Sequence, residues 1–314
     1  MRRRIPATHA LLCFEAAARH ESYTRAAQEL ALTQSAVSRQ IAALEAFVGQ
    51  PLFQRTRHGV ALTERGSAYA RQVRKRLQAL ERDTLEAMSG HGEGRSITLA
   101  AVPTFATRWL IPRLPGLAAL HPEIVVHIET RTRPFLFSDT GFDAALYAGT
   151  PEQVANWAGT RSVHLLREDL VPVCAPAMLP GGRELEPVEI ADRPLLQQST
   201  RPLAWQEWFE AAGVAVPVAL TGPRYELFSM TAAAAAHGMG IALVPRLLVD
   251  AELASGELVL ASTRRLHSDR SYHLVLPERA EPKPALGHFC DWLQTLARSA
   301  VATDSTGSPQ PAPR

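Results

Sequence analysis

The most constraining feature of the sequence is an unbroken helical pattern over residues 63–89. Its apolar and small residues recur in steps of three and four, which predicts one long helix with a narrow apolar stripe. A helix of this kind cannot bury its own stripe, so the pattern predicts a partner helix. Three glycines follow and predict a hinge. The stripe and hinge residues are Ala70, Val73, Leu77, Leu80, Thr84, Ala87, Gly90, Gly92 and Gly94.

The long helix and the hinge separate modules of different charge. Residues 1–90 hold 14 Lys and Arg against 8 Asp and Glu, and the remainder holds 19 against 23. This polarity indicates that the first module meets phosphates, although chance also produces an excess of this size. The pattern predicts a domain over residues 1–63, a linker helix and hinge over 64–94, and a second domain over 95–300. The Ser-, Thr-, Pro- and Gly-containing tail over 301–314 is expected to be disordered.

Three short helical patterns precede the long helix, at residues 9–19, 23–30 and 34–48. Ser22 and Thr33 are expected to cap the second and third helices, and Gly49 is expected to end the third. The exposed face of the third helix carries short hydrogen-bonding groups and an arginine, which suits a DNA major groove. Two helices joined by a short turn in this way predict a helix-turn-helix. An ordinary three-helix bundle with a polar outer face is the alternative.

Residues 52–63 predict two short strands around a Gly-bearing turn with a basic tip, which is typical of a wing. The third helix is expected to contact bases and phosphates in the major groove, and the wing to contact the adjacent backbone or minor groove. Arg39 is the strongest single candidate, either bidentate to a guanine or clamping a phosphate. The candidate DNA-contacting residues are Thr33, Gln34, Ser35, Ser38, Arg39, Arg55, Arg57 and His58.

A set of sequence runs at fixed mutual spacing resembles the DNA-binding domain of LysR-type transcriptional regulators over residues 6–63. The runs are FEAAA at 14–18, TRAAQEL at 24–30, TQSAVSRQI at 33–41, LE at 44–45, LFQR at 52–55 and LTERG at 62–66. The resemblance continues to about residue 298. Residues 102–114 and 233–243 are similar to the branch that contains activators of glycine cleavage, inducible β-lactamase and tryptophan synthase.

The second module alternates strand and helix patterns, which indicates an α/β domain. Strands are expected at 97–102, 124–129, 143–147, 170–174, 195–198, 241–244 and 272–276, with helices at 105–120, 203–212, 228–237 and 286–298. The resemblance implies two Rossmann-like subdomains crossed twice by the chain, as in periplasmic-type solute-binding proteins, with a ligand cleft between them. The expected fold is therefore an α+β multidomain chain: a winged helix-turn-helix, a long linker helix and an α/β effector-binding domain.

Thr104 lies at a predicted strand-to-helix junction, where its hydroxyl and the free amides of the helix start suit a carboxylate or another anion. A threonine that only caps its own helix is the alternative. The resemblance implies that further residues face the same cleft. Arg131 and Arg133 either supply charge there or lie in a solvated loop. The candidate effector-binding residues are Thr104, Phe105, Tyr147, Ser199, Thr200 and Phe228.

Motifs for catalysis are missing from the sequence. It contains no HExxH, GxSxG or GxxxxGK pattern, and Gly238-x-Gly240 lacks the third glycine of a dinucleotide site. No enzymatic activity, cofactor or metal site is therefore expected. Cys13, Cys174 and Cys290 lie far apart among apolar neighbours, which predicts core positions, with a redox switch as the minor alternative.

The sequence has no run of about 18 uncharged apolar residues, and its first residues lead into a mixed helix. A cytoplasmic protein that does not bind a membrane is expected. The resemblance implies a homodimer that assembles into a homotetramer, binds an interrupted inverted repeat in double-stranded DNA, and engages RNA polymerase. A stand-alone solute-binding protein would need a signal peptide, and a DNA-compacting protein would not need a solute cleft.

Overall fold

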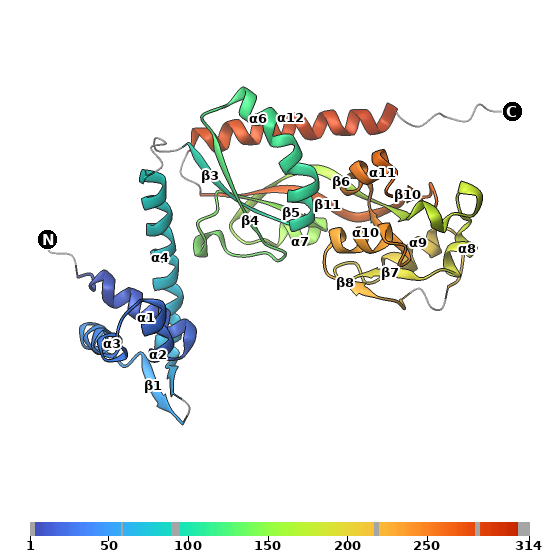
Figure 1. The fold of residues 1–314 in the computed structure, drawn as a ribbon. Helices are drawn as coiled ribbons and strands as arrows, with labels where there is room; N and C mark the ends of the chain where they lie inside the picture. The colour runs from blue at the N-terminus through green and yellow to red at the C-terminus, as the bar shows by residue number, and fades with distance from the viewer. Residues whose placement is uncertain (1–3, 58, 89–94, 217–219, 280–282, 307–314) are drawn as a thin grey trace. The chain divides into compact units, whose positions relative to one another are not determined.

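The computed structural model describes residues 4–57, 59–88, 95–216, 220–279 and 283–306 (Figure 1). The chain divides into two compact units, one containing Met1–His91 and the other containing most of residues 92–314. The boundary falls in the glycine-containing stretch, and Gly90, Gly92 and Gly94 themselves lie outside the described residues.

The first unit opens with helices α1 (Thr8–His20), α2 (Tyr23–Glu29) and α3 (Gln34–Val48). The predicted caps of α2 and α3 are confirmed, because Ser22 accepts a hydrogen bond from the Arg25 amide and Thr33 accepts one from the Ala36 amide. Gly49 ends α3 in the left-handed conformation, with φ of 74°. Side chains from the three helices share one core with the start of the long helix α4.

Strands β1 (Phe53–Thr56) and β2 (Gly59–Leu62) form the predicted antiparallel hairpin, and α4 (Glu64–Met88) follows directly. The Thr63 hydroxyl accepts a hydrogen bond of 2.9 Å from the Gly66 amide and so caps α4. A Cβ atom at Gly66 would lie 2.0 Å from the Leu52 carbonyl oxygen. Only glycine therefore lets α4 approach the residue that precedes β1.

The apolar stripe of α4 divides into two parts. Ala70 and Val73 are buried in the core of the first unit, and Leu77 packs against that core. Leu80, by contrast, is 53% exposed, and Leu85, which the predicted stripe did not include, is 60% exposed. The prediction that the whole stripe faces a partner helix is therefore wrong for its first half, because α1 and its neighbours within the same chain cover that half.

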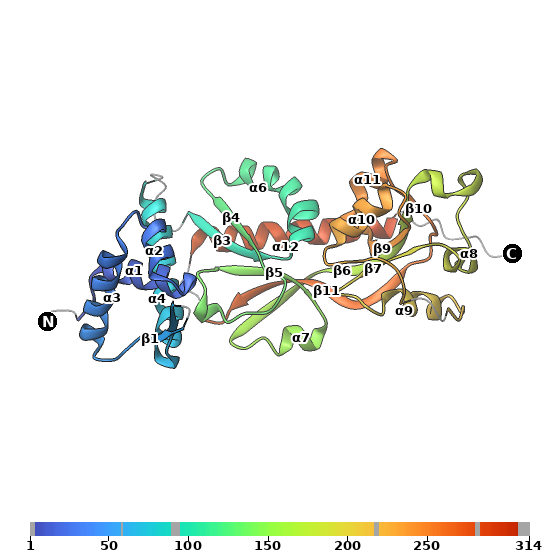
Figure 2. The same ribbon diagram turned by 60° about the horizontal axis from the view of Figure 1, so that its bottom comes forward.

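The second unit contains one mixed sheet built from two subdomains (Figures 1 and 2). Subdomain I contains β3 (Ser96–Ala101), β4 (Val125–Thr130) and β5 (Ala144–Gly149), and subdomain II contains β7 (Leu195–Gln198), β8 (Arg224–Tyr225), β9 (Ile241–Pro245) and β10 (Val259–Leu260). In subdomain I, β3 pairs in parallel with β4 and β5, and in subdomain II, β7 pairs in parallel with β8 and β9. Strand β10 pairs with the last residues of β6 (Thr160–Cys174).

Two long strands connect the subdomains. Strand β6 (Thr160–Cys174) pairs with β11 along its first part and with β9 along its last residues, and β11 (Leu266–Pro277) also pairs with β5. The chain thus crosses from one subdomain to the other on β6 and returns on β11. This arrangement confirms the implied double crossing, and both strands are longer than the segments 170–174 and 272–276 expected from sequence.

Helices cover both faces of the sheet. Helix α12 (Pro284–Thr306) and helix α7 (Pro151–Ala155) lie on opposite faces of the sheet (Figure 2). Leu146 and Leu274 belong to the core on the α12 face, and Tyr147 and Val275 belong to the cluster on the α7 face. Subdomain II carries α8 (Pro187–Ala191), α9 (Ala204–Ala211), α10 (Phe228–Ala236) and α11 (Asp250–Ser255). The helical state of residues 301–306 in α12 corrects the tail predicted to be disordered from residue 301. Residues 307–314 lie outside the described residues.

The helix expected over residues 105–120 is not continuous. Helix α5 (Pro103–Phe105) passes into a π-helical turn at Ala106–Leu110, then a 3-10 turn at Ile111–Arg113, and then α6 (Leu114–Leu120). Pro112 explains the interruption, because proline has no amide hydrogen for the helical ladder and its ring displaces the preceding turn. No helix among the described residues is long and apolar enough to cross a membrane.

Candidate functional site

The predicted recognition surface lies on α3 of the first unit. Val37, Ile41 and Leu44 hold one face of α3 in the core, which turns its N-terminal polar face outward. Thr33, Gln34, Ser35 and Arg39 are exposed and Ser38 is half-buried. The structure therefore brings all five predicted residues to one exposed end of a helix.

The side chains of this α3 surface differ in the hydrogen bonds and ion pairs that they make within the protein. The Thr33 and Ser35 hydroxyls lie 3.1 Å apart and hydrogen-bond each other. Arg39 makes no ion pair or hydrogen bond with any described residue. A free guanidinium beside two hydroxyls can bind either a base edge or a phosphate.

The hairpin β1–β2 supplies the predicted wing. Phe53 at its base is buried against Phe14 and Tyr23, so the hairpin is anchored in the core, whereas Arg55 and Arg57 are exposed. His58 lies outside the described residues. Two exposed guanidinium groups on an anchored hairpin suit contact with a phosphate backbone.

The second unit contains a cavity of about 130 Å³ in the cleft between its subdomains. The cavity lies beyond the carboxyl ends of β3, β5, β7 and β8, where ligands of open α/β sheets bind. Thr104, Phe105, Tyr147, Thr200 and Phe228, five of the six candidate effector-binding residues, line this cavity. Ser199 is exposed and does not line it, because the backbone pairing of its amide with the Tyr225 carbonyl turns this residue away.

Thr104 connects the two subdomains across this cavity. Its Oγ1 accepts a hydrogen bond of 3.3 Å from the backbone amide of Ser229, in the first turn of α10, and lies 3.5 Å from the Ser229 hydroxyl. The alternative that Thr104 caps its own helix is therefore wrong, because Val102 holds the N-cap position of α5 without a side-chain bond. The ion pair of Arg108 with buried Glu252 is a second link between the subdomains.

A buried charged cluster forms one wall of the cavity. Arg201 Nε and Nη2 donate to the two Glu168 carboxylate oxygens at 2.7 and 2.8 Å, and Glu168 is completely buried. Burial opposes the charge of Arg201, but these two hydrogen bonds raise the pKa of its guanidinium overall. Burial, reinforced by the neighbouring Glu168 carboxylate, raises the pKa of the Tyr272 hydroxyl well above its ordinary value. Tyr272 is therefore a neutral hydrogen-bonding group in the cavity wall.

Arg270 is the second guanidinium that lines the cavity. It is half-buried, and its Nη1 donates to the Gln153 side-chain oxygen at 3.0 Å. Burial first, and the positive charge of Arg201 second, lower the pKa of Arg270. An anion bound beside Arg270 would favour the charged guanidinium and so offset both of these contributions to its pKa. The exposed Glu226 lies at the rim of the same cavity.

Several residues in or beside the cleft cavity were not predicted from the sequence, because the segments that carry them meet only in the fold. Ser229 is 125 positions from Thr104, and Glu168 and Arg270 lie on the two crossing strands. Arg201 had a usable signal, because it lies three residues after the end of β7. Arg131 and Arg133 do not line the cavity, and Arg131 pairs with Glu129.

The three cysteines lie outside the α3 surface, the wing and the lining of the cleft cavity. Cys13 and Cys174 are buried and Cys290 is half-buried. Burial raises the pKa of Cys174 and of Cys290 to about 11, and it raises the pKa of Cys13 as well. A protonated thiol is a poor nucleophile, which favours the prediction of core positions.

Comparison with protein families accounts for both units. Residues 8–67 match the family model of the lysR-family bacterial regulatory helix-turn-helix protein, and residues 90–298 match the LysR substrate binding domain. The glycine cleavage system transcriptional activator of Escherichia coli K12 is 34% identical over 302 residues, covering 96% of each chain. The transcriptional activator AmpR of Rhodobacter capsulatus is 33% identical, covering 91% of this chain and 95% of its own.

A solved structure agrees with these relatives. The effector domain of AmpR from Pseudomonas aeruginosa superimposes with a TM-score of 0.59 at 28% identity, covering 67% of this chain and 98% of that domain. The matches to both family models span the helix-turn-helix and the cleft-bearing unit described above. The chain therefore belongs to the LysR family, and it is a DNA-binding transcriptional regulator with an effector-binding domain.

Proposed function

We propose that the cleft of the second unit binds a small anionic effector and that α3 and the wing contact promoter DNA. The observation that supports the effector site most strongly is the convergence of Thr104, Thr200 and Arg270 on one cavity from both subdomains and a crossing strand. Effector binding would favour one of the existing arrangements of the subdomains, and this shift would change how the regulator holds its DNA.

The effector is a compact molecule with a carboxylate or similar anionic group. A cavity of about 130 Å³ is large enough for a small organic molecule. Glu168 already neutralises Arg201, so Arg270 is the guanidinium available to an anion. Melting shifts of the full chain across amino acids, short peptides and aromatic acids test this proposal.

The variant Arg270→Gln should abolish the shift that the best acid produces, because it removes the positive charge that faces the cavity. Arg133→Gln is the matched control, since Arg133 is exposed and does not line this cavity. A shift that persists in Arg270→Gln would show that the anion binds elsewhere. A panel in which only uncharged compounds shift the melting temperature would contradict an anionic effector.

A second prediction concerns the bridging threonine. Thr104→Val keeps the side-chain volume but removes the acceptor of the Ser229 amide, which typically costs about 1 kcal/mol and up to about 3 kcal/mol beside a charged ligand. We expect effector affinity to fall several-fold to a hundredfold, measured by calorimetric titration, while operator affinity without effector stays unchanged. Thr107→Val is the control, because Thr107 is exposed and bonds only backbone carbonyls. An unchanged titration midpoint would remove Thr104 from the site.

The exposed part of α4 is the proposed dimerisation surface. Leu80 and Leu85 present large apolar side chains to solvent, in contrast with the buried first half of the helix. Dimers joined there would assemble into a tetramer, bind an interrupted inverted repeat and engage RNA polymerase. Residues 64–94 would then combine a dimerisation helix with a hinge, between a DNA-binding domain over 1–63 and an effector domain over 95–300.

A third prediction tests this surface. Replacing Leu80 and Leu85 together with Asp would bury two charges in the proposed seam, which is strongly unfavourable. We expect light scattering to detect monomers, with an unchanged circular dichroism spectrum. Val188→Asp, at an exposed apolar residue of α8, should leave assembly intact. Retention of the wild-type oligomer by the Leu80/Leu85 variant would place the interface elsewhere.

A further inference from the structure

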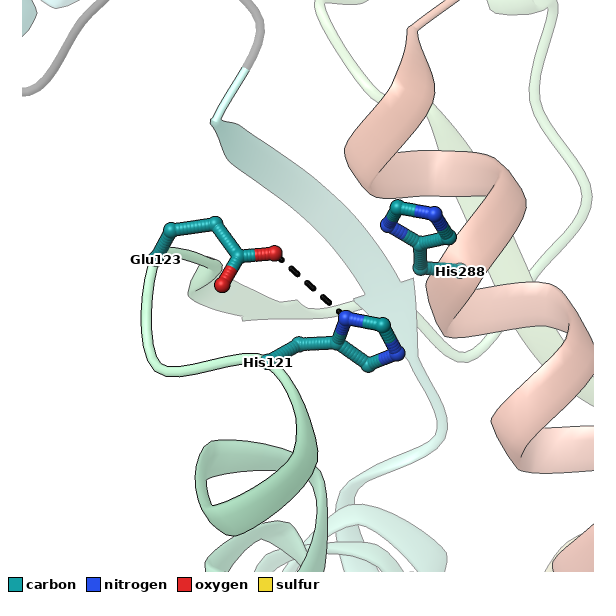
Figure 3. Close-up of side chains that lie close together, drawn as sticks. All are labelled: His121, Glu123 and His288. Carbon is teal, nitrogen blue, oxygen red and sulfur yellow. Dashed lines mark ion pairs between the residues drawn. The ribbon is translucent and has the colours of Figure 1, made fainter.

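A cluster of three metal-binding side chains lies in subdomain I, away from the residues that line the cleft cavity. His121 and Glu123 belong to the turn between α6 and β4, and His288 projects from α12 (Figure 3). One ligand atom from each of the three side chains lies within 4.8 Å of the others. We propose that this cluster binds a divalent transition-metal cation, with Zn²⁺ as the best match.

The geometry of the cluster is close to that of a zinc site. At zinc–ligand distances near 2.0–2.1 Å, two ligand atoms in a tetrahedral site lie about 3.3 Å apart. His121 Nδ1 and Glu123 Oε1 are 3.4 Å apart, so this pair already has the required separation. The widest separation of 4.8 Å must shrink by about 1.5 Å. Rotation of these side chains, which are half-buried or exposed, accomplishes this change, and in Figure 3 all three project into the same space.

The backbone on both sides of the cluster is held by the protein core. The His121 amide donates to the Leu117 carbonyl at 2.8 Å, and the Ile124 amide donates to the His121 carbonyl at 3.1 Å, which closes the turn that presents both ligands. On α12, the residue after His288 is Phe289, which is completely buried. The ligands therefore start from fixed positions, and binding orders only side chains.

The donor set selects the class of metal. Two imidazoles and one carboxylate suit zinc and its neighbours nickel, cobalt and copper, whereas magnesium and calcium prefer oxygen ligands alone. Three protein ligands leave a fourth position for water. Without metal, the His121 and His288 rings stack at 4.4 Å between centroids with planes inclined by 12°. A bound ion would join the α6–β4 turn to the start of α12.

Zinc titration of the untagged full chain after chelator treatment tests the proposal. We expect calorimetry to detect one Zn²⁺ per chain and no response to Mg²⁺ or Ca²⁺. His121→Gln and His288→Gln should each weaken zinc binding by at least about tenfold, because even residues outside the ligand set change metal affinity by 10–100-fold. His127→Gln, at an exposed histidine of β4, should bind zinc as the wild type does. Absence of zinc binding, or equal affinity in all four proteins, would overturn the proposal.

Cobalt absorption provides a second measurement that does not depend on affinity. Co²⁺ bound by nitrogen and oxygen ligands should produce visible d–d bands without the intense thiolate-to-metal band of a cysteine ligand. We expect this spectrum in the wild type and in His127→Gln, and its loss in His288→Gln. A thiolate band in the wild type, or an unchanged spectrum in His288→Gln with a native circular dichroism spectrum, would place the metal at another site.

Discussion

Glu168→Ala is expected to destabilise the effector-binding unit by about 3–5 kcal/mol, because it leaves the buried Arg201 guanidinium without its counter-charge. Glu168 has no exposed surface, and the Arg201 side chain is only 10% exposed. The carboxylate accepts both guanidinium hydrogen bonds, and the Ser268 hydroxyl lies 3.4 Å from it. Urea unfolding of the full chain, followed by circular dichroism, measures the loss.

A double variant separates the unpaired charge from lost packing. Glu168→Met combined with Arg201→Met removes both charges and retains apolar volume, so it should be considerably more stable than Glu168→Ala. Glu189→Ala is a surface control, because Glu189 pairs with Arg183 in solvent and should change stability far less. If Glu168→Ala lowers the free energy of unfolding by less than about 1 kcal/mol, the Glu168–Arg201 ion pair is not shielded from water as described.

Arg39→Ala is expected to weaken specific operator binding by about 1–3 kcal/mol, which is roughly fivefold to more than a hundredfold. The melting temperature should not change, because Arg39 is exposed and has no partner among the described residues of the free protein. Fluorescence anisotropy with a labelled promoter duplex measures the effect. Arg71→Ala, at an exposed arginine of α4, is the control. Unaltered affinity of Arg39→Ala would exclude Arg39 from the interface.

Arg39→Lys distinguishes the two contacts that the sequence leaves open. A lysine retains a phosphate contact but cannot reproduce a bidentate contact to guanine. Near-wild-type affinity in Arg39→Lys, together with a salt slope reduced by about one in Arg39→Ala, would indicate a phosphate clamp. Weak binding by Arg39→Lys with an unchanged salt slope would indicate base recognition.

Local signals in the sequence predicted the first unit almost to the residue. Ser22, Thr33 and Gly49 act within their own turns, so their neighbours in sequence determine the helix ends. Periodicity likewise predicted α4. It did not reveal which elements cover the stripe, because Ala70 and Val73 have the same character whether their partner is α1 or a second chain.

Predictions failed where distant segments determine the structure. The first part of β6 was missed because its pairing with β11 comes from a segment about a hundred residues away, as the contact between Glu168 and Ser268 illustrates. The same separation concealed Ser229 and Arg270. Thr104 lines the cavity, and its hydroxyl accepts a hydrogen bond from the Ser229 amide in α10 of the other subdomain, which local patterns do not reveal.

The most direct test of specific DNA recognition compares two duplexes of equal length and composition. One carries the promoter sequence with its inverted repeat, and the other carries the same bases in shuffled order. At physiological salt, the wild-type chain should bind the promoter duplex at least about a thousandfold more tightly, as specific regulators do. Equal affinity for the two duplexes would contradict the central claim that α3 and the wing of this regulator recognise a defined operator.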